Sequence, residues 1–198
     1  MPNFNTPAGL VPVEYLLGTP WSGKARRYHI PAADTNAYAI GDPVTLNGTA
    51  DARGVAGVVL ATPGAGMIGP VVGMGGTTYG GPSVDPTNLN TTVIPATKLR
   101  DYYVLVADDP NIIFEVQEIG TGTALVAAAV SLNCNLVAAA NSGYMSGWVL
   151  NNATEAVTAT LDVKLLGLRQ FTGNEFGFFS KWNVLINNHL YRGGIAGV

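Results

Sequence analysis

The chain has 198 residues, a formal net charge of -3 and a single cysteine, Cys134. One cysteine excludes an intramolecular disulfide, and the scattered Lys and Arg residues exclude the basic surface that nucleic-acid binding requires. Only 12% of the residues are charged, against roughly 25% in typical soluble domains. Because neutral or apolar surface is common where subunits meet, the composition indicates a subunit of an assembly.

The N-terminal segment, residues 1–20, contains Pro2, Pro7 and Pro12 and has little periodicity. Proline fixes φ and lacks a backbone donor, so we expect an extended arm that packs on a neighbouring surface. The segment lacks the basic start and continuous apolar core of a secretory signal. No run of the chain approaches the ~18 apolar residues that span a bilayer. These features favour a protein that is made in a cytoplasm, stays there and has no membrane partner.

From residue 21 to residue 198 the pattern is that of one β-rich domain. Apolar runs at 25–32, 37–48, 54–64 and 67–76 predict short strands, the second ending at the turn pair Asn47-Gly48. Residues 73–92 are rich in Gly, Thr and Asn and have no periodicity, which predicts a long loop that touches a neighbouring subunit. The glycine spacing there fits neither a phosphate-binding nor a dinucleotide-binding motif.

The stretch YYVLVADDPNIIFEVQE, residues 102–118, predicts a β-hairpin. Two β-rich runs flank a turn in which Asp109, Pro110 and Asn111 occupy the first three positions, so Asp108 and Asp109 have a structural role. Glu115 follows about six residues later, roughly 20 Å along an extended strand. A hydrolytic carboxylate pair must lie within ~10 Å, so the hairpin alone forms no acidic site. A partner from another segment remains open.

Residues 120–133, GTGTALVAAAVSLN, predict one short helix, about 121–132, with Thr121 or Thr123 as its cap. Further strands are expected at 146–151, 158–170 and 181–191. In 158–170, polar residues alternate with apolar ones, which predicts one wetted face formed by Thr158, Thr160, Asp162 and Lys164. The predicted fold class is therefore mainly β, a single barrel or sandwich with one short helix and the N-terminal arm.

Few residues suggest catalysis. His29 and His189 are the only histidines, and we interpret His189 as a hydrogen-bonded structural residue. A Ser–His–Asp set stays open, although no G-x-S-x-G elbow marks a nucleophile. Cys134 fits a small buried hydrophobe, and Trp148 and Trp182 fit the core, with a ligand platform as the alternative.

A zinc site would need more His and Cys residues. Asp108, Asp109 and Asn111 could offer oxygens to Ca²⁺, but EF-hand spacing is lacking. We predict no catalytic, metal-binding or cofactor-binding residue, and we expect that the protein is not an enzyme.

The second half resembles a group of structural proteins from tailed bacteriophages. The blocks that carry the resemblance are residues 102–118, 125–137, 142–170 and 174–198. More loosely, AIGDPVTL (39–46) and GVAGVVLA (54–61) resemble barrel-type cement proteins. The resemblance covers most of residues 100–198 and, more loosely, 24–72, and it does not reach the arm at 1–20.

This resemblance implies a non-enzymatic virion protein that binds the outside of a capsid and stabilises it, as a decoration or cement component. The expected partners are the major capsid protein and further copies of the chain, as a dimer or trimer, with assembly in the host cytoplasm. A major shell protein or another head or tail structural protein is the alternative, although shell proteins are usually longer and contain a long spine helix. A carbohydrate-binding or hydrolytic β domain is the third reading. It would need exposed aromatic and carboxylate groups near the loop 73–92, where Tyr79 and Asp85 lie.

Overall fold

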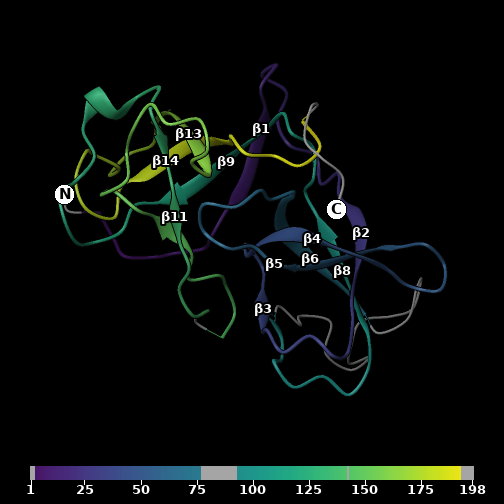
Figure 1. Ribbon diagram of the computed structural model, residues 1–198. Helices are drawn as coiled ribbons and strands as arrows, with labels where there is room; N and C mark the ends of the chain where they lie inside the picture. Colours follow the sequence, from purple (N-terminus) through teal and green to yellow (C-terminus); the bar gives the residue numbers. More distant parts are fainter. Residues whose placement is uncertain (1–2, 77–92, 142, 193–198) are drawn as a thin grey trace.

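The chain folds into strands with almost no helix. The computed structural model describes residues 3–76, 93–141 and 143–192. Within these ranges every regular element is a β-strand except one 3-10 turn, so the mainly β fold class predicted from the sequence is confirmed. The longer strands divide between a small barrel and a separate sheet (Figure 1), and each has its own hydrophobic core.

Five strands close into the barrel in the order β2-β5-β4-β6-β8, and β8 pairs back onto β2. Only β2 and β5 run parallel among these pairs. Alternate side chains of a strand point to opposite sides, so one face of each strand fills the interior with residues such as Tyr28, Val58 and Val104. The strands are β2 Arg26–Ile30, β4 Pro43–Ala50, β5 Ala56–Leu60, β6 Gly69–Gly76 and β8 Tyr102–Val106, and beside them β3 Tyr38–Ala39 pairs with β7 Val93–Ile94.

The second sheet has the order β1-β9-β14-β13-β10, with antiparallel pairs throughout. Its core contains Trp148 and Trp182, 2% and 0% exposed, so both tryptophans fill the core as predicted. The strands are β1 Val11–Tyr15, β9 Ile112–Gln117, β10 Asn133–Cys134, β13 Val163–Leu168 and β14 Lys181–Ile186, and nearby β11 Leu136–Val137 pairs with β12 Val149–Leu150.

The predicted hairpin at 102–118 is wrong, although its turn is right. Asn111 N donates to Asp109 Oδ1 (2.8 Å) and Ile112 N to Asp109 O (3.1 Å), as the turn signals predicted. However, β8 pairs with β2 and β6 in the barrel, whereas β9 pairs with β1 and β14 in the other sheet. A turn sets only the direction of the chain. Core packing decides which strands pair, and it pairs β8 and β9 with four other strands and not with each other. The stretch therefore connects the two cores.

The predicted helix at 121–132 is also wrong. Only Ala127–Ala129 forms a short 3-10 turn, η1, and Val126 and Val130 on either side are extended. The backbone donors that a helix would use go to distant segments: Leu125 N binds Glu118 Oε1 and Ser131 N binds the Leu165 carbonyl, each at 2.8 Å. Tertiary hydrogen bonds thus replace the helical ones that alanine propensity favoured.

Two predicted strand boundaries and one predicted surface need correction. β4 runs through Asn47-Gly48 with a shift of register, and the turn follows at Asp51–Gly54. β13 begins only at Val163, and Asp162, which was predicted to face water, is fully buried. Its carboxylate accepts hydrogen bonds from Gly64 N and Leu136 N, both at 2.8 Å. The alternating pattern gave the wrong prediction for Asp162, because a buried carboxylate is stable when two backbone N–H groups donate hydrogen bonds to it.

Of the predicted arm, residues 3–20 lie in the described part of the chain; residues 11–15 form a strand, and the chain then turns at 16–18. This segment packs on the chain's own fold. β1 pairs with β9 in the chain's own sheet, with Val11 opposite Glu115, and Leu10 is 1% exposed in the core. The whole barrel lies between these two paired strands in the sequence. The predicted long loop at 73–92 contributes residues 73–76 to β6, and the rest of it, with Tyr79 and Asp85, lies outside the described residues.

Leu10→Ala tests whether the N-terminal segment belongs to the folded domain. We expect the free energy of unfolding to fall by about 2–5 kcal/mol, because the substitution removes a fully buried side chain and leaves a cavity. Chemical denaturation with a cooperative two-state fit measures this change. Leu17→Ala is the matched control, because Leu17 is 94% exposed and its loss should cost less than about 0.5 kcal/mol. Equal effects of the two variants would mean that the segment is not part of the stable fold.

Candidate functional site

The four carboxylates of the 102–118 stretch each have a different structural partner. Asp109 closes the turn. Asp108 is buried and accepts a hydrogen bond from the Tyr28 hydroxyl (2.5 Å), while Arg26 Nε lies 3.3 Å from it. Glu115 pairs with Lys181 (3.1 Å) and Arg169 (3.4 Å). The acidic stretch is therefore not a single site.

Glu118, the fourth carboxylate, is completely buried. Its Oε1 accepts bonds from Leu125 N (2.8 Å) and from the Asn152 amide (3.0 Å), and its Oε2 accepts one from Ser180 (2.8 Å). These bonds tie the 3-10 turn region and the start of β14 to the end of β9. Glu118 is a structural anchor of the second sheet.

The two histidines lie in unrelated environments. His29 on β2 points at Asp101, with 3.2 Å between Nε2 and Oδ2, and its ring lies 5.6 Å from that of Tyr103. The Tyr103 hydroxyl donates to Asp51 at 2.6 Å, which raises the pKa of the tyrosine to about 12 and lowers that of the aspartate. This cluster joins the turn after β4 and the loop before β8 to the outside of the barrel.

His189 is fully buried where the C-terminal segment crosses to the barrel. Its Nδ1 accepts a hydrogen bond from Tyr191 N (3.0 Å), and residues 188–190 form backbone hydrogen bonds with Met67. Burial lowers its pKa to about 4. Cys134 is likewise buried, donates to the Asn151 carbonyl (2.9 Å), and has its pKa raised to about 11 by burial. Both groups are neutral at pH 7, and both are held by the fold.

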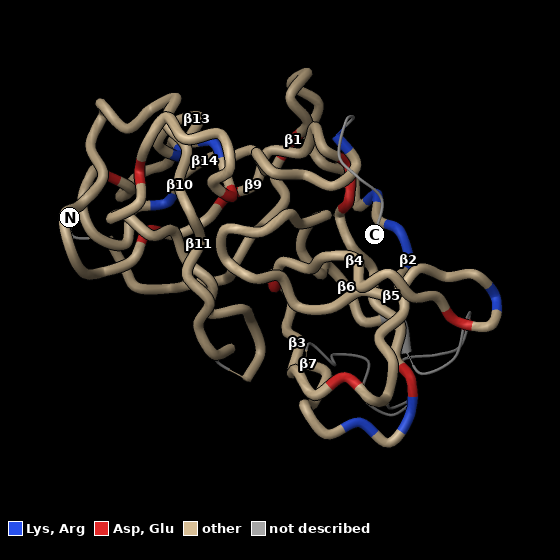
Figure 2. The backbone as a smooth tube through the Cα atoms, viewed as in Figure 1, with Lys and Arg blue, Asp and Glu red and all other residues tan. Residues whose placement is uncertain are grey.

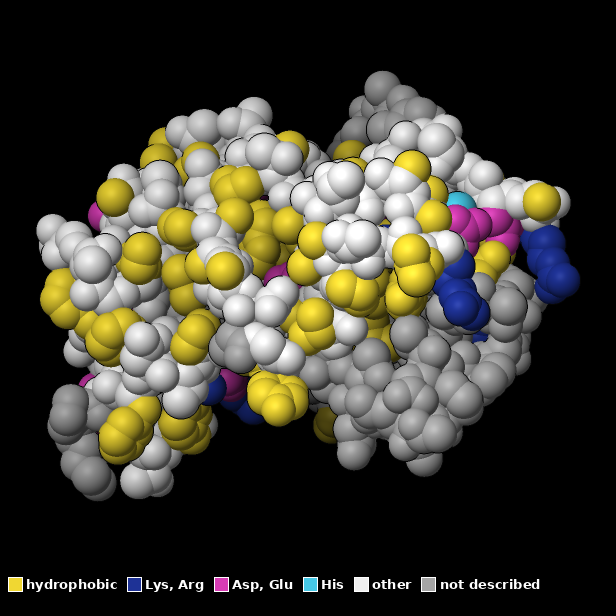
Figure 3. Space-filling view, turned by 90° about the horizontal axis from the view of Figure 1, so that it is seen from below, with side chains coloured by type: hydrophobic (Ala, Val, Ile, Leu, Met, Phe, Trp, Pro, Cys, Tyr) yellow, Lys and Arg dark blue, Asp and Glu magenta, His cyan; other side chains and the backbone are white. Residues whose placement is uncertain are grey.

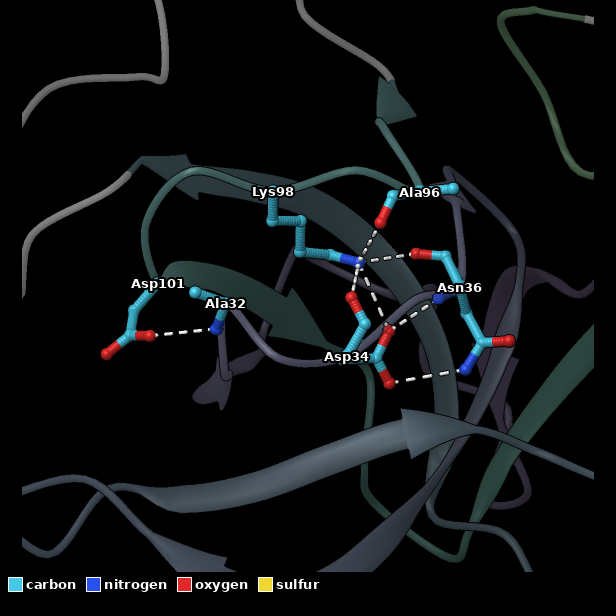
Figure 4. A network of polar contacts seen from close by, with 6 residues as sticks. All are labelled: Ala32, Asp34, Asn36, Ala96, Lys98 and Asp101. Carbon is cyan, nitrogen blue, oxygen red and sulfur yellow. Dashed lines mark hydrogen bonds and ion pairs between the residues drawn. The ribbon is translucent and has the colours of Figure 1, made fainter.

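Sequence reasoning missed Lys98, whose side chain is completely buried. Its ammonium donates to the carbonyls of Asp34 (2.8 Å) and Asn36 (2.5 Å) and lies 3.1 Å from Asp34 Oδ1 (Figure 4). The centroid of the Tyr38 ring lies 5.3 Å from the same ammonium. A lone lysine in a loop predicts solvent exposure, so no signal in the sequence marks it. The ammonium holds the loop after β2 against the segment before β8.

The second feature that sequence reasoning missed is a group of exposed phenylalanines. We call the side chains of Phe4, Phe171, Phe176 and Phe178 the phenylalanine face; they are 76%, 49%, 46% and 41% exposed. Phe4 and Phe171 line one hollow, and the segment of Phe4 is hydrogen-bonded to the loop that carries Phe176 and Phe178. Exposed apolar groups that gather in this way mark interaction sites. The only signal in the sequence is NEFGFFSK, which places three phenylalanines outside any alternating pattern.

The phenylalanine face is built on a fixed scaffold. Asn3 Nδ2 donates to the carbonyls of Glu175 (2.8 Å) and Phe178 (3.0 Å), and Glu175 N donates back to Asn3 Oδ1 (3.1 Å). Asn174 closes the base of the same loop by bonding the Arg169 and Lys181 carbonyls and Lys181 N. The Phe176 ring packs 5.7 Å from that of Trp182. The loop is thus ordered before any partner binds, which lowers the entropy cost of association.

A hollow of about 360 Å³ opens beside the face, and Phe4, Phe171 and Phe179 contribute to its walls. Charged residues are few and are spread through both halves of the molecule (Figure 2). On the side seen in Figure 3, hydrophobic side chains are distributed over the surface, and charged ones gather mainly at the barrel end. Within the part of the chain that the structure describes, no three His, Cys, Asp or Glu side chains are placed to hold a metal ion.

Lys98→Met should destabilise the fold strongly. The substitution keeps the length of the side chain but leaves the Asp34 carboxylate and the two carbonyls without their cation, and breaking a buried pair in this way costs about 3–5 kcal/mol. The measurement is the midpoint and slope of urea unfolding. Lys24→Met, at an exposed position, is the control and should be nearly neutral. A small effect at position 98 would show that water can replace the ammonium.

His189 should make the protein sensitive to mild acid. The unfolded chain takes up this proton near pH 6.5 and the folded chain only near pH 4, so the unfolded state binds more protons between these values. The free energy of unfolding should therefore be constant above about pH 7 and fall, by up to about 3 kcal/mol, as the pH drops from 6.5 to 4. Unfolding curves across this range measure the change.

His189→Asn supplies the control, because its amide oxygen can still accept the Tyr191 N–H while the side chain no longer titrates. The variant should lose most of the extra slope between pH 6.5 and 4. An unchanged slope would assign the acid sensitivity to other groups.

Comparison with known proteins identifies no relative. No protein-family model matches the chain, and neither does any curated protein or solved structure. The described part of the chain also contains no helix of the length and hydrophobicity needed to cross a membrane. What the protein does has to be inferred from its own residues.

Proposed function

We propose that this chain is a non-enzymatic structural protein of a tailed-phage virion, which binds the outside of the capsid and stabilises it. Its partner is the major capsid protein. The observation that carries the proposal is the phenylalanine face, because it presents three partly exposed aromatic rings on a loop that is already ordered and a fourth, Phe4, on the segment that is hydrogen-bonded to this loop. Aromatic anchors of this kind dominate the energetics of protein interfaces.

The composition supports the same conclusion. With 12% charged residues and several of these buried, the exterior is largely neutral, a property that favours permanent contact with other protein surfaces. Hydrophobic burial is non-directional and roughly proportional to area, so such a surface can stabilise a shell by adding contacts that the shell lacks. Cementing a capsid requires this mechanical effect and no chemical step.

The resemblance of most of residues 100–198 to phage head proteins supports the choice of the major capsid protein as the partner. The phenylalanine face lies inside this region except for Phe4, which the Asn3 hydrogen bonds hold beside it. The barrel strands β4 and β5 fall in the segments that are similar to barrel-type cement proteins. The proposed interface and the proposed family thus rest on the same part of the chain.

Phe178→Ser and Phe4→Ser should weaken binding to capsids of the same virus that lack the protein. Each truncation removes an aromatic anchor, and such residues contribute more than about 1.4 kcal/mol at interfaces, or at least a tenfold rise in Kd. Co-sedimentation of purified protein with undecorated capsids measures the change, and a cryo-EM difference map locates the bound density.

Val157→Ser is the control, because Val157 is 86% exposed outside the face and its removal should not alter binding. Thermal melts of all variants should stay within a few degrees of the parent. Normal binding by both phenylalanine variants would exclude the face as the contact, and a parent protein that does not bind capsids would refute the proposed function.

A further inference from the structure

A hollow of about 350 Å³ lies between the barrel and the segment that follows β11. Ala37 and Leu60 line it on the barrel side, and Trp148 lines it together with the alanine segment 138–140. Among the described residues of its wall, Asp42 has the only ionisable side chain. The hollow is therefore an apolar recess with one carboxylate; we call it the Asp42 hollow.

The wall formed by the alanine segment is held against the barrel. Ser146 N donates to the Ile40 carbonyl (2.8 Å), and Met145 forms a parallel β-bridge with Ile40. Gly147 allows the carbonyl oxygen of Ala140 to approach closely, because a Cβ at position 147 would clash with that oxygen. The Asp42 hollow is thus bounded by backbone that the fold fixes, so little ordering is needed when a ligand enters.

Asp42 is a buried carboxylate without a counter-ion. The residue is 3% exposed, and its Oδ2 accepts a hydrogen bond from Ala39 N (2.7 Å). The Ser146 hydroxyl donates a second hydrogen bond, and burial raises the pKa of the carboxyl above its ordinary value. Both donors are neutral, and within the described residues no Lys, Arg or His forms an ion pair with Asp42. Because an uncompensated buried charge is unfavourable, a cation that reaches this carboxylate is stabilised.

Elsewhere in the fold a buried aspartate is compensated by an ammonium. The side chain of Asp34 is 8% exposed, and the ammonium of the fully buried Lys98 lies 3.1 Å from its Oδ1 (Figure 4). The Asp42 hollow offers the same two elements, a carboxylate and an apolar wall for a methylene stem, but no described lysine lines it. Charge complementarity therefore selects a cation on an apolar stem as the occupant.

The hydrogen bonds of Asp42 favour lysine over arginine. A guanidinium binds a carboxylate best through two parallel hydrogen bonds, one to each oxygen. Ala39 N and the Ser146 hydroxyl already use part of the acceptor capacity of this carboxylate. An ammonium is a compact point charge that can bind through one remaining acceptor position. Its four methylenes can be buried along Leu60 and Trp148, as lysine stems commonly are on apolar surface.

The entrance of the hollow suits a residue that remains attached to its own backbone. The alanine segment 138–140 is exposed, so the wall that it forms can be reached from the surface. We propose that the Asp42 hollow binds the side chain of a lysine presented by a partner protein, with the lysine ammonium at the Asp42 carboxylate.

The test is a titration of the 15N-labelled chain with Nα-acetyl-lysine N-methylamide, followed by NMR. The amide signals of residues 138–140 and the signals of Trp148 should shift and saturate with a Kd of roughly 1 mM, as suits a ligand of this size. The norleucine analogue keeps most of the stem but lacks the ammonium, and it should bind at least about tenfold more weakly. Equal binding of the two probes, or shifts confined to other parts of the chain, would overturn the proposal.

Asp42→Asn removes the charge and leaves an amide oxygen for Ala39 N. This variant should raise the Kd of the lysine probe at least about tenfold. Asp109→Asn is the matched control, because it makes the same change at a carboxylate that lines a different hollow and keeps an oxygen for the turn bond from Asn111 N. It should leave the Kd unchanged. If Asp42→Asn does not fold, the two probes on the parent chain still decide whether the charge is required.

Two further probes test the identity of the occupant. n-Butylammonium carries the stem and the charge without a peptide backbone, so binding of this probe but not of the capped lysine would assign the hollow to a free amine and refute a protein partner. The capped arginine should bind at least about threefold more weakly than the capped lysine, and tighter binding would contradict the choice of lysine. No capsid is present in these assays, so their outcomes are independent of the proposed function.

Discussion

The reversal between β8 and β9 determines the architecture of the whole molecule. Asp109 and Pro110 turn the chain, while the neighbouring Asp108 is anchored to Tyr28 in the barrel. Residues before the turn therefore pack in one core and residues after it in the other. Because the anchor and the turn are adjacent, the direction in which β9 leaves the barrel is fixed by a buried, charge-assisted hydrogen bond. Both sheets are positioned by this short connection.

Buried charges explain why the surface is even more neutral than the composition suggests. Among the described residues, five Asp, Glu and Lys side chains are buried: Asp42, Lys98, Asp108, Glu118 and Asp162. Each is satisfied mainly by backbone groups or by uncharged side chains, as for Lys98 in Figure 4. Such contacts specify loop positions that hydrophobic packing alone would leave degenerate. These buried charges fix the positions of loops, and neutral and apolar side chains form most of the exterior.

Local signals in the sequence predicted local structure well and long-range structure poorly. The turn at Asp109–Ile112, the buried tryptophans and most of the long strands follow from residue type and periodicity. The partners of β8 and β9, the burial of Lys98 and Asp162, and the replacement of a helix by a 3-10 turn depend on contacts between segments far apart in the chain. The phenylalanine face was missed for a related reason, since exposure of an apolar residue is a property of the finished fold.

The pairing of β1 with β9 across the barrel makes the barrel an insertion within the second sheet. Arg26 at the start of β2 lies opposite Val106 at the end of β8, so the folded barrel returns the chain to the place where it left. Once the barrel has formed, only short connectors separate β1 from β9, and the loop-closure entropy of joining them is much smaller than for an open chain of the same length. Pairs of high sequence separation slow folding. The topology therefore favours a folding order in which the inserted barrel forms first and the strands of the second sheet, including β1 and β9, pair afterwards.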